Sequence, residues 1–193
     1  MATRKTTAKR PAAKRAGPKK PVSSTPPGLT PCLWFDKNAL EAAEFYVSVF
    51  PRSRITDVLR SPADNPSTKK GEVLLVEFKL DGKPFQALNG GPYFKLSEAV
   101  SFVVDCKDQA EMDRYYDALS AVPEAEQCGW VKDKFGVSWQ LTPRALVRLL
   151  ASRDAAKAQR VMEAMLPMKR LDVAALEAAG RAAPRRKAAR AAR

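Results

Sequence analysis

The sequence contains no histidine, and this absence excludes several kinds of site at once. Without imidazole the chain has no Ser-His-Asp triad, no Cys-His dyad, no histidine general base and no histidine metal ligand. Its three cysteines, Cys32, Cys106 and Cys128, are widely spaced and form no C-x-x-C pair. We therefore expect no structural zinc site, and so few thiols are typical of a reducing, cytoplasmic compartment.

Long hydrophobic runs are also missing. No apolar segment approaches the roughly 20 residues that a membrane-spanning helix needs. The basic N-terminus is not followed by the apolar stretch of a secretory signal. We therefore expect no membrane association. At 193 residues, 45% of them hydrophobic, the chain is long enough for one domain with a core, or one domain with tails.

Acidic side chains are absent from both ends of the chain, whose net charge is +13. Residues 1–20 carry eight Lys and Arg, residues 181–193 carry six, and neither segment has an acidic residue. The remainder is close to neutral. The ends are rich in Ala, Pro and cations, and such segments bury too little apolar surface to offset the entropy of ordering. We expect disordered tails over 1–27 and 181–193.

Between these ends, strand and helix patterns alternate. The first pass predicts strands over 32–35, 54–59, 72–80 and 85–88, with Asp81-Gly82 as a hairpin turn. Its helix follows Asn38, an N-cap residue with Glu41 at the capping-box position. The second pass predicts strands over 100–106, 129–132 and 137–141, with a helix capped by Asp108. Lys132 and Asp133 are expected to face solvent. Helices are then expected over 143–150, over 153–166, and from Asp172 to a closing Gly180.

The two passes resemble one another. A shift of 70 residues places Asn38 on Asp108 and Glu41 on Glu111. Later in each pass stands an aromatic residue followed by glutamine, Phe85-Gln86 and then Trp139-Gln140. The agreement of caps, aromatic residues and order predicts an internal duplication. Paired units of this kind commonly share a concave surface in which a ligand binds.

Three segments carry a family resemblance: TPCLWFDKNALEAAEFYVSVFPRSRI, FQALNGGPYFKLSEAVSFVVDC and CGWVKDKFGVSWQLTP. Over residues 28–150 they resemble the PhnB-like, or demethylubiquinone methyltransferase-like, branch of the vicinal oxygen chelate superfamily. The resemblance implies an α+β fold in which two βαβββ modules, about 28–94 and 95–143, form an open cup-shaped sheet, the glyoxalase fold. It also implies a homodimer, and a C-terminal helical extension over 151–180.

Metal-using members of this superfamily take ligands, typically His and Glu, from four strand positions. The stretch DKFGVSWQL places Gln140 at the position of the metal-binding Glu, and Gln86 is its counterpart in the first module. The other two positions fall at Cys32 and near Ala99. Two amides, one thiol and one methyl group make a poor cation site. We therefore expect no metal.

The methyltransferase label of this family implies a site for S-adenosylmethionine. The usual site has a glycine-rich turn that opens a helix, followed by an acidic residue that binds the ribose. The sequence contains no G-x-G. Asn89-Gly90-Gly91 follows a strand instead, and is expected to be a strand-ending turn or a backbone donor at the rim of the cup. We therefore expect no cofactor.

Seven residues are candidates for ligand binding in the cup: Cys32, Trp34, Gln86, Asn89, Trp130, Trp139 and Gln140. The tryptophans could equally pack in the core or at a dimer interface, the glutamines could satisfy each other, and the cysteines could be small buried apolar groups. We predict that the protein binds a small polar or aromatic molecule. The alternative is an enzyme of the superfamily's lyase or dioxygenase type, metal-independent or metal-dependent, and no catalytic residue is assigned.

The basic ends support a second alternative, nonspecific association with nucleic acid. Flexible arms with many cations attract phosphate backbones without reading bases. A solubilising role, or a compositional bias of the genome, would account for the same ends. The cations predicted to contact nucleic acid are Lys9, Arg10, Lys14, Arg15, Lys19, Lys20, Arg185, Arg186 and Lys187.

Overall fold

A computed structural model describes residues 28–182 of the chain. The tail residues predicted to contact nucleic acid, and nearly all of both predicted disordered tails, lie outside the described residues. One tail boundary is corrected, because Arg181 is the last residue of a helix and forms an ion pair with Glu177.

The first module is a four-stranded sheet with one helix. In chain order its elements are β1 (Cys32–Phe35), α1 (Ala39–Val49), β2 (Arg54–Arg60), β3 (Val73–Leu80) and β4 (Lys83–Asn89). The strand order is β1-β4-β3-β2, with β1 parallel to β4 and the other neighbours antiparallel. Asp81 (φ 48°) and Gly82 (φ 79°) form the β3–β4 turn, so the predicted hairpin is confirmed.

The second module repeats this plan with one strand fewer. It consists of β5 (Ser101–Cys106), α2 (Gln109–Leu119), a short 3₁₀ helix η1 (Pro123–Ala125), β6 (Trp130–Lys132) and β7 (Ser138–Pro143), with strand order β5-β7-β6. Between α2 and β6, where the first module has β2, the described chain forms η1 and an isolated bridge from Gln127 to Trp130. The two-module α+β fold is confirmed, and its second half is βαββ.

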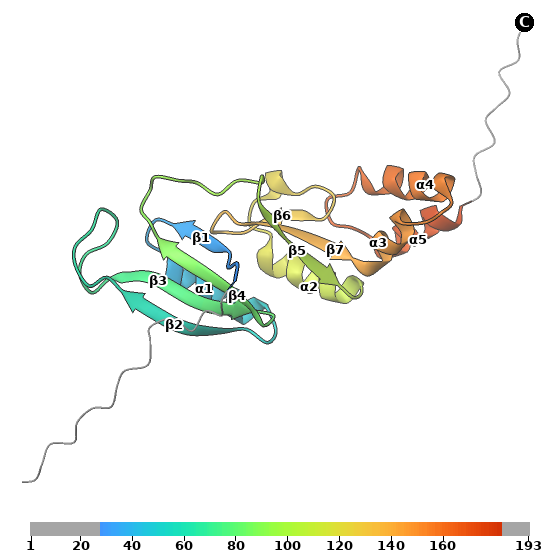
Figure 1. Ribbon diagram of the computed structural model, residues 1–193. Coiled ribbons are helices and arrows are strands. Elements are labelled where there is room, and N and C mark those ends of the chain that lie inside the picture. The colour runs from blue at the N-terminus through green and yellow to red at the C-terminus, as the bar shows by residue number, and fades with distance from the viewer. Residues whose placement is uncertain (1–27, 183–193) are drawn as a thin grey trace, which may run out of the picture.

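Three helices follow β7: α3 (Arg144–Leu150), and then α4 (Ala155–Met165) and α5 (Val173–Arg181), which make up the predicted C-terminal extension. Gly180 lies inside α5 and does not close it, contrary to the prediction. A Cβ on Gly180 would lie 3.0 Å from Cδ2 of Leu149, so the glycine allows α5 to pack closely on α3. In Figure 1 the two modules and the extension follow one another along an elongated molecule.

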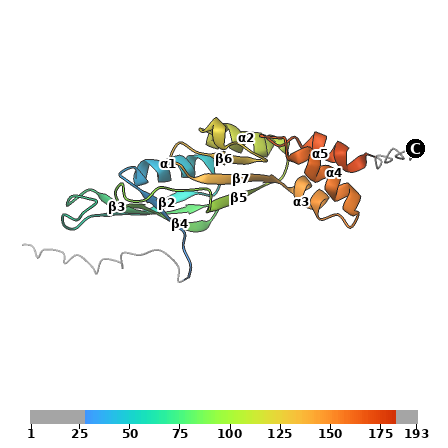
Figure 2. The same ribbon diagram turned by 90° about the horizontal axis from the view of Figure 1, so that it is seen from above.

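Helices α1 and α2 cover one face of the two sheets, as Figure 2 shows. The strands alternate accordingly: on β4, Phe85, Ala87 and Asn89 are buried, while the residues between them are half-buried on the opposite, open face. One aromatic cluster joins the modules. Tyr46 of α1 lies 5.5 Å from Trp139 of β7, ring centre to ring centre, and Phe50 lies 5.1 Å from the same indole. The two halves therefore share a core.

Two helices are capped by side chains close in sequence, and α1 is capped by a side chain from a distant segment. Asp108 accepts a hydrogen bond from the Glu111 backbone and Asp172 from the Ala175 backbone, so these predicted caps are confirmed. Asn38 is the N-cap residue of α1, as predicted, but its side chain makes no capping hydrogen bond. The first N–H of α1, on Ala39, instead donates at 2.9 Å to Oδ1 of Asn89, the last residue of β4 and the register neighbour of Phe35.

Candidate functional site

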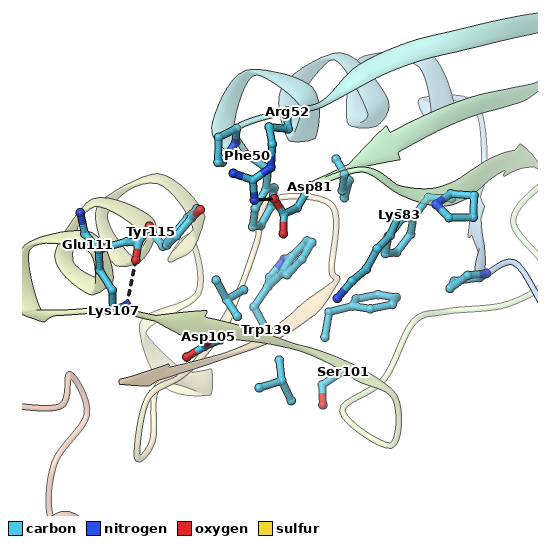
Figure 3. Close-up of a pocket in the computed structure, with 18 of the residues that line it drawn as sticks. Phe50, Arg52, Asp81, Lys83, Ser101, Asp105, Lys107, Glu111, Tyr115 and Trp139 are labelled. Atoms are coloured by element: carbon cyan, nitrogen blue, oxygen red, sulfur yellow. Dashed lines mark hydrogen bonds and ion pairs between the residues drawn. The ribbon is translucent and has the colours of Figure 1, made fainter. Parts of the chain in front are cut away.

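A cleft of about 890 Å³ lies where the two modules meet (Figure 3). Turns and strand ends form its walls. The first module contributes the α1–β2 turn and the β3–β4 hairpin, and the second contributes β5 and the start of α2. The aromatic and charged side chains of its lining include Phe50, Arg52, Asp81, Lys83, Phe85, Phe102, Asp105, Tyr115, Trp139 and Arg144.

The floor of the cleft is aromatic. Phe102 lies between Phe85 and Trp139, with ring centres 5.2 Å and 5.4 Å away. Phe50 stacks on Tyr115 at 5.1 Å and completes this floor. Trp139 is 2% exposed, so the cleft reaches the shared core of the two modules. Such a surface accepts a planar apolar group by stacking or edge-to-face contact.

The rim of the cleft is charged. Arg52 is paired with Asp81, and Arg144 donates from Nε to Asp105 at 2.9 Å, so both arginines at the rim are neutralised by a carboxylate. Lys83 differs, because it has no ion pair within residues 28–182. Figure 3 shows its side chain extending from β4 toward the cleft, whose lining also includes Trp139. The cleft therefore combines an apolar floor with one cation that the described chain does not neutralise.

The buried carboxylate of Asp133 holds Trp139, one of the aromatic residues of the floor. Oδ1 of Asp133 accepts hydrogen bonds from the backbone of Phe135 (2.8 Å) and Val137 (3.0 Å), and Oδ2 accepts from Nε1 of Trp139 (2.8 Å). The expectation that Asp133 faces solvent is thus wrong, since it is 1% exposed. Burial raises the pKa of this carboxyl although its hydrogen bonds oppose the shift. Burial, and then the charge of Asp133, also raise the pKa of the Tyr46 phenol.

Three of the seven predicted ligand residues lie on the open face of the first sheet. Cys32 and Gln86 are direct neighbours in the β1–β4 register, as the superfamily positions imply. The Gln86 amide donates to Glu77 at 3.2 Å, and burial raises the pKa of the Cys32 thiol, which does not favour a nucleophilic thiolate. Trp34 donates from its indole to the Gly91 carbonyl at 2.8 Å and meets Phe94 edge to face.

The other four residues are divided between two surfaces. Trp130 and Gln140 are paired across β6 and β7 on the open face of the second sheet, and the Gln140 amide donates to Ser101 at 2.8 Å. Asn89 and Trp139 lie on the helix-covered side. Of the seven, the cleft lining includes Trp139, so the cleft and the open faces are two different surfaces. The ligand contacts predicted for the open faces remain predictions.

The four positions that would hold a superfamily metal do not fit one. In the parallel register of β5 and β7, Gln140 stands opposite Val103, so the fourth position falls on a valine and not near Ala99. The set is then Cys32, Gln86, Val103 and Gln140: one thiol, two neutral amides, one side chain with no donor atom, and no carboxylate. Within the described part of the chain, no group of three or more Cys, Asp or Glu side chains is arranged to hold a metal ion.

The Gly90-Gly91 turn ends β4 and opens no helix. The Gly90 N–H donates to Phe35 at 2.8 Å, and a Cβ on Gly90 would overlap the Trp34 ring. The indole thus fills the space beside this turn. Such a turn is not the phosphate- or nucleoside-binding loop of the common methyltransferase fold.

Sequence reasoning missed most of the cleft. In the sequence, only turns are predicted where Arg52, Asp81 and Lys83 lie. Phe102 is predicted only as part of a strand, with no sign of a role in binding. The predicted α1–β2 and β3–β4 turns do fall at one end of the first sheet, and this was the available signal. What the sequence does not state is that the second module packs against that end.

The paired modules, the strand orders and the helix-covered sheets define a protein of the vicinal oxygen chelate, or glyoxalase, fold. Residues 27–142 match the family model described as 3-demethylubiquinone-9 3-methyltransferase. The chain belongs to this family, the PhnB-like branch of the fold.

The chain is also similar to solved structures. A putative 3-demethylubiquinone-9 3-methyltransferase, PhnB protein, from Bacillus cereus is 32% identical, with a TM-score of 0.51, over 60% of this chain and 98% of its own. A protein from Pseudomonas aeruginosa is 20% identical, with a TM-score of 0.47, over 60% of this chain and 96% of its own. Among curated proteins none matches. The helical extension lies beyond the family-model match. Separately, no helix in residues 28–182 is long and apolar enough to cross a membrane.

Proposed function

We propose that the protein binds a small aromatic molecule carrying an anionic group in the cleft between its modules. The observation that carries this proposal is the placement of Lys83, a cation without an ion pair in the described chain, over a floor of aromatic rings. A ring of the ligand would pack on Phe85 and Phe102, and its carboxylate or phosphate would accept hydrogen bonds from the Lys83 amine.

The size and chemistry of the cleft support this proposal. Ligand pockets of proteins usually have volumes of 300–1,000 Å³, are mostly apolar and contain a few polar groups that fix orientation. A cleft of about 890 Å³ falls in that range. A charge-assisted hydrogen bond is roughly twice as strong as a neutral one. An anion would therefore be favoured over a neutral ring of the same shape.

We assign no reaction to the site. Methyl transfer is in the description of the family, but the Gly90-Gly91 turn is packed against Trp34 and offers no matching nucleotide site. Metal-assisted chemistry lacks a suitable donor set at Cys32, Gln86, Val103 and Gln140. A sequestering or sensing role agrees best with these residues.

Titration calorimetry with three matched probes, benzoate, benzamide and benzylamine, tests the proposal. Benzoate is expected to bind most tightly and benzylamine most weakly. Lys83→Ala should lower the benzoate affinity about tenfold, or ~1.4 kcal/mol, and leave benzamide unchanged. Lys70→Ala, an exposed lysine in the β2–β3 loop, is the control. Equal benzoate affinity in the wild type and Lys83→Ala, or loss of binding with EDTA, would contradict the proposal.

We also propose a homodimer in a reducing cytoplasm. Strands β1 and β5 are edges of their described sheets. Val100, just before β5, is 70% exposed, and Val103, within β5, is 63% exposed. An exposed apolar strand edge is normally covered by another part of the protein or by a partner. A second copy presents a similar edge. The three free thiols, Cys32, Cys106 and Cys128, agree with a reducing compartment.

A further inference from the structure

A second, smaller pocket lies at the end of the first sheet opposite to the cleft. Its volume is about 300 Å³, at the lower limit for ligand pockets of proteins. The end of β1, the β1–α1 loop, the linker between β4 and β5, and the β6–β7 turn form its walls. Residues before α1 line this pocket and residues after α1 line the cleft, and a helix of 11 residues spans about 16 Å. The pocket is therefore separate from the cleft.

Aromatic side chains dominate the walls of this pocket: Trp34, Phe35, Phe94 and Phe135. Trp34 and Phe94 meet at an interplanar angle of 77°, with ring centres 4.9 Å apart. Phe35 and Phe135 meet at 78°, with ring centres 6.3 Å apart. Rings at nearly right angles form a corner, and the faces of aromatic rings are electrostatically negative. Such a corner suits a compact cation better than a flat apolar ring.

One ring of this pocket already holds a cation of the chain. The Lys134 amine lies 4.8 Å from the centre of the Phe135 ring and forms an ion pair with Glu41 at 3.2 Å. A cation within about 6 Å of a ring centre is attracted by its π system. Within residues 28–182, no Lys or Arg lies over the Trp34 or Phe94 ring. A ligand cation would therefore lie in the corner that these two rings form.

Two exposed side chains of opposite charge also line the pocket. They are Asp36 and Lys95, and neither has an ion pair within residues 28–182. Asn38 lines the pocket as well, and its amide is not used in capping α1. The pocket thus offers a carboxylate, an amine and an amide beside the aromatic corner, which matches a ligand that carries both charges.

We propose that this pocket binds a small zwitterion with a quaternary ammonium group and a carboxylate, the chemistry of glycine betaine. The trimethylammonium group would lie in the corner of Trp34 and Phe94, and the ligand's carboxylate would accept hydrogen bonds from the Lys95 amine. The Asp36 carboxylate would add attraction for the cation. A quaternary ammonium has no N–H, so it leaves no donor unsatisfied against aromatic rings, whereas a primary ammonium would.

Isothermal titration calorimetry of the full chain with matched probes tests this proposal. Glycine betaine should bind with a dissociation constant of about 1 mM or less. The anion of tert-butylacetic acid has the same shape with carbon in place of nitrogen, so it measures the contribution of the positive charge. It should bind about fivefold more weakly. Choline, which lacks the carboxylate, and glycine, which lacks the methyl groups, should also bind more weakly than betaine.

Variants of exposed side chains locate the site without disturbing the core. Phe94 is 67% exposed, and Phe94→Leu should lower the betaine affinity about fivefold while tert-butylacetate binding hardly changes. Tyr93→Leu is the matched control, because Tyr93 is 65% exposed and does not line the pocket. Lys95→Gln should weaken betaine and tert-butylacetate but not choline, and Asp36→Asn should weaken betaine and choline but not tert-butylacetate.

Five results would overturn the proposal. They are absence of binding with up to about 10 mM betaine, equal affinity for betaine and tert-butylacetate, equal effects of Phe94→Leu and Tyr93→Leu, tighter binding of phosphocholine, and loss of betaine binding in Lys83→Ala. Tighter binding of phosphocholine would assign the pocket to lipid headgroups, and loss in Lys83→Ala would place betaine in the cleft. Since Lys83 lines the cleft and not this pocket, the two sites are tested independently.

Discussion

Replacing Asn89 with alanine should destabilise the protein far more than the same change at Asn38, although Asn38 is the residue that the sequence nominates as the cap of α1. Asn89 is 4% exposed and both ends of its amide are used. Oδ1 accepts from the Ala39 N–H at 2.9 Å, and Nδ2 donates to the Val73 carbonyl at 2.9 Å. One side chain therefore ties the start of α1 to the first residue of β3.

The magnitude follows from these two bonds. Loss of a helix N-cap costs about 1 kcal/mol, with a range of 0.5 to 2. The Val73 carbonyl would lose its donor, and a buried polar group left unsatisfied costs about 1 to 3 kcal/mol. Asn89→Ala should thus lower the free energy of unfolding by about 2 to 4 kcal/mol. Asn38→Ala should cost less than about 0.5 kcal/mol, as expected of a surface change away from any cap or core contact.

Urea unfolding followed by tryptophan fluorescence and by circular dichroism measures both variants, with coincident transitions as the check on two-state behaviour. Asn89→Asp provides a third point, because an aspartate keeps the acceptor for Ala39 and loses the donor to Val73. At neutral pH its buried carboxylate would face that carbonyl, so Asn89→Asp should be less stable than the wild type and should regain stability as the pH falls and the carboxyl protonates. Equal losses at positions 38 and 89 would refute the long-range cap.

Three further changes probe other parts of the fold. Gly90→Ala places a Cβ 2.5 Å from Cη2 of Trp34 and closer still to two other ring atoms. It should therefore lower the free energy of unfolding by about 1 to 3 kcal/mol. In a Trp34→Leu background the same change should have little effect, and a double-mutant cycle measures this difference. Burial raises the pKa of the Asp133 carboxyl in the folded protein above its ordinary 3.8. The wild type should therefore lose stability relative to Asp133→Asn as the pH rises through that folded pKa. If the difference in free energy of unfolding between the two proteins did not change from pH 4 to 8, this prediction would be contradicted. Val103→Lys should convert the proposed dimer to a monomer in sedimentation experiments, and an unchanged mass would exclude the β5 edge as the interface.

Local signals in the sequence were sufficient for most elements of the fold. Asp108 and Asp172 cap their helices because the cap and the N–H it accepts from are three residues apart, and Asp81-Gly82 forms its turn because both residues adopt positive φ. These interactions need no knowledge of the rest of the chain. The family resemblance supplied the two-module plan, which the strand orders confirm.

What the sequence could not supply were contacts between distant segments. Asn89 reaches Ala39 across 50 residues, and Gly180 is required by Leu149 of another helix. Asp133 looked like a solvent-facing turn residue because its local pattern, an aspartate three residues before a glycine, is typical of turns. Its burial follows from Trp139 and from the packing of the first module against the second, which the pattern does not encode.

The cleft and the core of the molecule share side chains, and this sets the kind of experiment that can separate binding from folding. Phe50 and Trp139 line the cleft and also join the two modules in one aromatic cluster. Truncating either ring would lower ligand affinity and stability together, because a large core residue costs about 3 to 5 kcal/mol when cut to alanine. Lys83 is exposed and contributes no ion pair within the described residues, so its removal changes the ligand contact with little effect on the fold. A ligand that packs on this shared floor should in turn stabilise both modules at once, so its binding should raise the melting temperature of the whole cooperative unit and not that of one half.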